Sequence, residues 1–156
     1  MRWRLISTAS AALVLATLVA PSVRADSASD VNGQVGGVAL HGFDPVIYFT
    51  QNKAQIGSPK FTAMHHGVTY QFVSKEDQAA FEANPEKYVP QFGGFCAFAA
   101  SVGVKADADP HDFAIVNGKL YVNNNDKAQQ LFQKDVAGTI GKAEHNWPEV
   151  AKQQMQ

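Results

Sequence analysis

The chain has 156 residues, with 13 Lys and Arg against 14 Asp and Glu and a formal net charge of -1. Its only arginines are Arg2, Arg4 and Arg24, so residues 26–156 carry 10 lysines, 14 acidic residues and a net charge of -4. Nucleic acids and anionic membrane surfaces are bound mainly through clustered positive charge. The composition therefore predicts neither as a partner.

The first 25 residues have the pattern of a cleavable secretory signal peptide. Arg2 and Arg4 precede an apolar run from Leu5 to Ala20, and Val23 and Ala25 are small residues in front of a cleavage site. The run is shorter than the ~20 apolar residues of a membrane span. The sequence predicts export to a bacterial periplasm without a membrane span, then a flexible lead-in (26–37), one folded domain (38–150) and a C-terminal tail (151–156).

Local signals in the first half of the domain predict a helix start, a hairpin and a second helix. Asp44-Pro45 marks a turn or the beginning of a helix. Strand-forming residues flank a His-Gly turn in residues 61–73, which predicts a β-hairpin. Ser74 is placed to cap a short helix that Pro85 ends or restarts.

The second half has a similar mixture of signals. Gly93 and Gly94 precede Cys96, which begins a short helix or strand. Residues 112–124 alternate around Asn117-Gly118, the favoured pair of a type I′ hairpin turn. Amphipathic helices are predicted at 126–135 and 136–147. No internal repeat is apparent, and the lack of regular βαβ alternation predicts a small single α+β domain with two β-hairpins and several short helices.

Several stretches together resemble the stand-alone, exported proteins of the YHS-domain family, in the same order and over nearly all of residues 26–156. The stretches are LHGFDPVIYF (40–49), HGVTYQFVS (66–74), FEANPEKYVPQFGGFCA (81–97), DP (109–110), IVNGKLYVN (115–123) and AEHNWP (143–148). The resemblance implies a YHS-like fold. It also implies a relation to small metal-binding modules found beside copper-transporting ATPases.

The metal-binding form of that family uses three cysteines, and none of them is present here. By alignment on the Asp-Pro turn and on the His-Gly motif, those positions hold Ile47, Val73 and Asp77. The resemblance therefore implies the scaffold of the family and not its thiolate site.

Cys96 is the only cysteine, so it cannot form an internal disulfide. A thiolate with imidazole or thioether ligands selects soft metals such as Cu(I). Our first hypothesis is a copper site formed by Cys96 and His66, with His41, Met64 or His65 as further ligands. His65 and His66 are neighbours, so a strand would point them to opposite faces.

Two alternatives stay open at this point. In the first, Cys96 is a buried structural residue and the protein is an interaction or scaffold module that binds a periplasmic protein. In the second, Cys96 is a reactive thiol of an enzyme or redox sensor. The sequence contains no nucleophile elbow, phosphate-binding loop, zinc helix or CxxC motif, which favours a protein without catalytic activity.

Overall fold

The computed structural model describes residues 31–33 and 37–155, so the predicted signal peptide lies outside the described residues. The fold is a small α+β domain, as predicted. In the first half the elements are β1 (Val38–Ala39), the 3-10 turn η1 (Leu40–Gly42), α2 (Pro45–Gln51), β2 (Ser58–His65), β3 (Val68–Phe72), α3 (Lys75–Ala83) and α4 (Pro85–Tyr88). In the second half they are η2 (Gln91–Gly94), α5 (Ala97–Ser101), β4 (Asp109–Val116), β5 (Lys119–Asn123), α6 (Asp126–Lys134) and α7 (Val136–Val150).

Both predicted hairpins are confirmed, and each closes through a two-residue turn with positive φ at both positions. His66 and Gly67 have φ of 49° and 77°, and Asn117 and Gly118 have φ of 51° and 72°. These values are those of type I′ turns, whose twist matches the twist of the flanking strands. The β2–β3 hairpin gains β1 as a parallel third strand, whereas β4 and β5 form a sheet of their own.

Side-chain caps begin the helices that the sequence predicts. The Asp44 carboxylate accepts a hydrogen bond from the Val46 N–H at the start of α2, and the Ser74 hydroxyl accepts one from Asp77. One boundary differs, because α7 continues through Pro148 to Val150. The missing N–H of Pro148 falls in the last turn, and the Ala151 N–H still reaches the Trp147 carbonyl.

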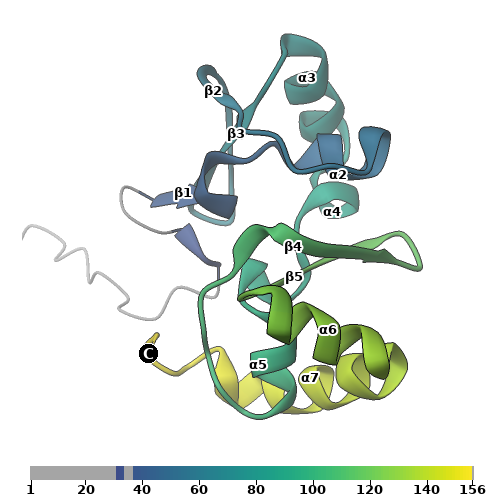
Figure 1. The fold of residues 1–156 in the computed structure, drawn as a ribbon. Helices are drawn as coiled ribbons and strands as arrows, with labels where there is room; N and C mark the ends of the chain where they lie inside the picture. The colour runs from purple at the N-terminus through teal and green to yellow at the C-terminus, as the bar shows by residue number, and fades with distance from the viewer. Residues whose placement is uncertain (1–30, 34–36, 156) are drawn as a thin grey trace, which may run out of the picture.

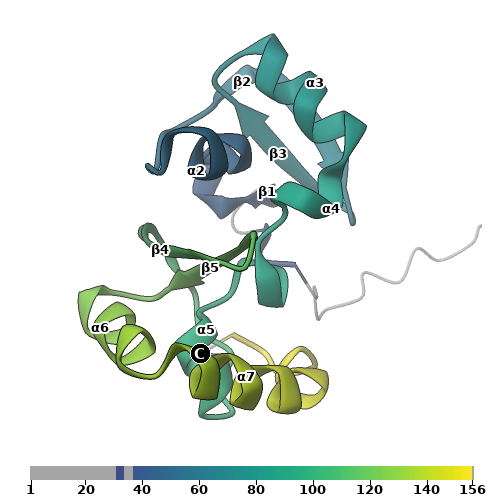
Figure 2. The ribbon, with the colours of Figure 1, turned by 90° about the vertical axis from the view of Figure 1, so that its right-hand side faces the viewer.

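The structure corrects the expectation that the chain has no internal repeat. Residues 38–88 and 90–150 follow the same course: an extended entry, a left-handed turn, a capped short helix, a hairpin and two helices. We call these segments the first repeat and the second repeat; in Figures 1 and 2 they form the two lobes of the molecule. Eight pairs of equivalent positions hold the same residue, which is too few to reveal the repeat in the sequence: Gly42/Gly94, Phe43/Phe95, Pro59/Pro110, Ala63/Ala114, Gly67/Gly118, Tyr70/Tyr121, Gln78/Gln129 and Phe81/Phe132.

Equivalent hydrogen bonds show that the similarity extends beyond the order of elements. The Asp44 N–H donates to Gln55 and the Cys96 N–H donates to the equivalent carbonyl of Ala106, both at 2.9 Å. From the fourth residue of the helix after each hairpin, the side-chain amide of Gln78 or Gln129 donates to a carbonyl of the first strand, at 2.8 and 2.7 Å. The two hairpins also share a break in register at the same place in the first strand.

The left-handed turns are a further shared feature. Leu40, His41 and Gly42 have φ of 50°, 52° and 84°, and Phe92, Gly93 and Gly94 have φ of 52°, 60° and 81°. Three successive residues with positive φ are rare, since only glycine adopts this conformation without steric cost. Their recurrence at equivalent places is strong support for a duplicated unit.

A shared core makes the two repeats one domain. Leu40 and Tyr48 of the first repeat pack with Leu120 and Val122 of the second, and the Tyr48 hydroxyl donates to the Pro110 carbonyl at 2.9 Å. Asn32, within the predicted flexible lead-in, is buried and donates from its backbone to Gly93 and from its side chain to Gly94. These contacts fix residues 31–33 against the second repeat.

Candidate metal centre

Two of the predicted ligands, His65 and His66, meet in the structure at the tip of the β2–β3 hairpin. The Nε2 atoms of His65 and His66 lie 2.9 and 3.3 Å from the same carboxylate oxygen of Glu86. Glu86 comes from α4, and one ligand atom from each of the three side chains lies within 4.8 Å of the others. Within the part of the chain that the structure describes, no other group of three histidine, cysteine or acidic residues meets in this way.

The hairpin and the first-repeat core set the geometry of this cluster. The His65 ring packs edge-on against Phe81 of α3, with 6.0 Å between ring centroids, and lies 4.0 Å from the His66 ring. The turn conformation of His66 brings its ring back beside His65 rather than to the opposite face of a strand. Hydrogen bonds from the two imidazoles hold the pKa of Glu86 below its usual value.

The donor set suits a divalent transition metal. Imidazole nitrogen binds zinc and copper, and a carboxylate adds a harder oxygen ligand. Bonds of ~2.0–2.2 Å from a metal to nitrogen and oxygen place neighbouring ligand atoms roughly 3 Å apart. The observed separations of 2.9 and 3.3 Å are therefore close to those that a bound ion requires.

Two other predicted ligands lie outside this cluster of three. Met64 precedes His65 on β2 and is 76% exposed. His41 lies in the left-handed turn, where its Nε2 is 3.1 Å from the Asp107 carboxylate. Burial acts to raise the pKa of Asp107, but hydrogen bonds from Asn32 and His41 outweigh it and keep the pKa below its usual value.

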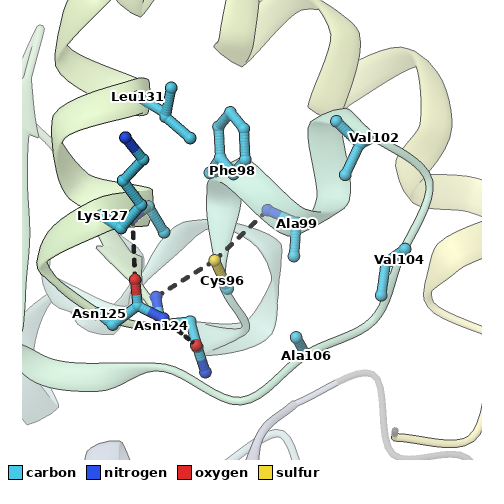
Figure 3. A pocket seen from close by; sticks show the side chains of 11 residues that line it. Cys96, Phe98, Ala99, Val102, Val104, Ala106, Asn124, Asn125, Lys127 and Leu131 are labelled. Atoms are coloured by element: carbon cyan, nitrogen blue, oxygen red, sulfur yellow. Dashed lines mark hydrogen bonds between the residues drawn. The ribbon is translucent and has the colours of Figure 1, made fainter.

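Cys96 is also separate from the histidines, because it belongs to the second repeat. Its sulfur is buried and accepts hydrogen bonds from the N–H groups of Ala99 and Asn124, at 3.3 and 3.2 Å. Figure 3 shows the sulfur at the base of a pocket whose lining, among the described residues, contains no histidine or methionine. The expected grouping of Cys96 with His66 is therefore not found.

The repeat explains what Cys96 does in the fold. Its counterpart is Asp44, whose two carboxylate oxygens accept from Val46 at the helix start and from Val73 after the hairpin, both at 2.8 Å. With one sulfur atom Cys96 also accepts from a helix start and from the residue after a hairpin: Asn124 is the equivalent of Val73, whereas Ala99 lies one position beyond the equivalent of Val46. Burial raises the pKa of the Cys96 thiol, so the thiol is neutral at physiological pH.

The sequence analysis missed Glu86 as a ligand. Glu86 is 20 residues from His66 in the chain and reaches it only because α4 folds back beside the hairpin. One local signal was available: Asn84-Pro85 starts a helix, and an acidic residue in the first turn is oriented by the helix start.

Among the described residues no helix is both long enough and apolar enough to span a membrane, in agreement with the prediction. Comparison with known proteins adds no relative: no family model matches the chain, and neither a curated protein nor a solved structure matches it significantly.

Proposed function

We propose that the protein binds one divalent transition-metal ion through His65, His66 and Glu86. The observation that carries this proposal is the convergence of both imidazole Nε2 atoms on one carboxylate oxygen, at separations that suit a shared ion. The proposal keeps the soft-metal function predicted from the sequence in a general form, as binding of a transition metal. It replaces Cys96 by a different set of ligands.

Copper in its divalent state is the ion that we expect to bind most tightly. Affinity for a given nitrogen and oxygen site rises along the first-row divalent metals to Cu²⁺ and falls again at Zn²⁺. Monovalent copper prefers thiolate and thioether ligands, and this site contains neither. With three protein ligands and two exposed side chains, the ion would keep an open position for water or for a donor from another molecule.

The proposed place of action is the periplasm, because residues 1–25 have the signal-peptide pattern. An exposed, incomplete ligand set suits reversible binding and transfer of a metal ion better than permanent storage. We therefore propose a metal-binding protein without catalytic activity.

A second candidate function is a scaffold module without metal. It is favoured by the hydrogen bonds of Cys96, which give the lone thiol a structural role equivalent to that of Asp44. In this version, Glu86 simply pairs with two surface histidines.

Calorimetric titration of the purified protein with Cu²⁺ and Zn²⁺ separates the two functions. We expect one equivalent of Cu²⁺ to bind with a Kd of about 1 μM or below, which corresponds to roughly -8 kcal/mol. His65→Ala and Glu86→Gln should abolish this binding. His145→Ala is the matched control, because His145 is an exposed histidine on α7, in the second repeat.

Cys96→Ser distinguishes the hairpin site from the thiol site predicted from the sequence. Binding that survives Cys96→Ser and disappears with His65→Ala supports the hairpin site. Binding that depends on Cys96, or no binding below about 100 μM, would refute the proposal.

A further inference from the structure

The second repeat contains a pocket of about 320 Å³ beside α5 and α6. Figure 3 shows side chains from α5, from the loop after it and from α6 around the opening. Apolar side chains form most of the lining: Phe98, Ala99, Val102, Val104, Ala106 and Leu131. A volume at the lower end of the range for small-molecule sites fits a ligand with a short apolar body.

Comparison with the first repeat shows how the pocket is formed. The position equivalent to Ala99 holds Ile47, which is 1% exposed and fills the first-repeat core. Alanine at this place in α5 leaves the additional space next to the Cys96 sulfur. The first repeat accommodates isoleucine at the equivalent position, so the fold does not require an empty space here.

The rim of the pocket combines exposed apolar surface with one positive charge. Val102 is 62% exposed, although it lines an apolar pocket. Among the described residues that line the pocket, Lys127 is the one with a basic side chain, and its equivalent in the first repeat is Glu76. Next to it the side-chain amides of Asn124 and Asn125 each donate one hydrogen bond within the protein, to Asp107 and to Asn124, and each has a second N–H.

We propose that this pocket binds a small amphipathic carboxylate, with its apolar chain inside and its carboxylate beside Lys127. Each buried methylene should raise the affinity about fourfold until the pocket is full. Because Lys127 is exposed, its charge should contribute about twofold to fivefold. Asp109, Asp112 and Asp126 line the hollow on the other side of Lys127, so the carboxylate is expected on the pocket side only.

Binding is reversible in this proposal and involves no bond to Cys96. The sulfur already accepts two backbone hydrogen bonds, and burial keeps the thiol protonated. The thiol therefore acts as an apolar base of the pocket. The site is independent of the proposed metal centre, which lies in the first repeat.

The test is a titration of the ¹⁵N-labelled protein with hexanoate, octanoate and octanol, followed by two-dimensional NMR. We expect shifts at Ala99, Val104 and Asn124, and tighter binding of octanoate than of hexanoate. Lys127→Met should weaken octanoate about twofold to fivefold and leave octanol unchanged. Lys60→Met, which removes the same charge from β2 of the first repeat, should have no effect.

Ala99→Ile tests the pocket itself, because it introduces the side chain of the first repeat. We expect a folded protein that binds neither octanoate nor octanol. If this variant fails to fold, Ala106→Leu closes the pocket from the loop side. Three results would each overturn the proposal. One is octanoate binding to a folded Ala99→Ile or Ala106→Leu variant. The others are octanoate binding with a Kd above about 1 mM and octanol binding as tight as that of octanoate.

Discussion

Replacing Cys96 by alanine removes one sulfur atom and with it the acceptor of two backbone N–H groups. The sulfur caps α5 through Ala99 and holds the end of the second hairpin through Asn124. Loss of a helix cap costs about 1 kcal/mol. The second N–H, left without its partner, adds about 1 kcal/mol. We expect Cys96→Ala to lower the free energy of unfolding by about 2 kcal/mol.

Urea unfolding followed by circular dichroism measures this change, with Val102→Ala as a control at the exposed end of α5. The control should stay within about 0.5 kcal/mol of the unmodified protein. Cys96→Asp supplies the carboxyl that the first repeat uses at this position. It should recover at least half of the loss at pH 5, where a carboxyl group in a similar setting is largely protonated.

The result for Cys96→Ala measures how much the two hydrogen bonds to the sulfur contribute. A change below about 0.5 kcal/mol would show that they contribute little and would refute the equivalence with Asp44. As a second measurement, a small thiol reagent should label Cys96 only after unfolding, because the side chain is 1% exposed.

Three further predictions follow from the repeat and from the buried groups. Burial raises the pKa of Asp44 to about 6 from 3.8, so its contribution to stability is present below pH 4 and is lost as the pH rises through 6. Urea unfolding from pH 4 to 7 should therefore show a fall of at most about 3 kcal/mol in the free energy of unfolding. Asp44→Asn should remove this fall, and a variant with the same pH dependence as the unmodified protein would contradict the prediction. The metal ligands can be placed at the equivalent positions of the second repeat by Val116→His, Asn117→His and Ala137→Glu. Calorimetry of this triple variant should find two Cu²⁺ ions bound per protein instead of one. A single bound ion would show that the two repeats differ in geometry at these positions. Phe132→Ala removes a fully buried ring from the second-repeat core and should cost about 3–5 kcal/mol in urea unfolding, whereas a loss below 1 kcal/mol would show that this core is not closely packed.

Much of the fold could be predicted because the relevant signals are local. The Asn-Gly and His-Gly pairs fix two turns, and Ser74 caps a helix with its own side chain. The repeat was missed for the opposite reason. The two repeats share backbone hydrogen bonds and turn conformations, which different side chains can support. In addition, the first repeat and the second differ in length by one residue before the hairpin, which shifts the alignment of their sequences.

The site was only partly predictable, since it depends on how separate segments pack. His65 and His66 were identified because they are adjacent in the chain, and Glu86 was not because only the folding of α4 brings it there. Cys96 attracted attention as the only thiol. Its environment could be interpreted only after Asp44 was found at the equivalent place.

The attachment of Lys105 has a consequence for the order in which the molecule is completed. Its ammonium is buried, lies over the Phe95 ring and donates to the carbonyl of Ala151 at 2.7 Å. A charge in that place is costly to bury without its acceptor. Burial of the Lys105 side chain in this position therefore involves residue 151, so the second repeat is complete only when the end of α7 has packed against the loop after α5.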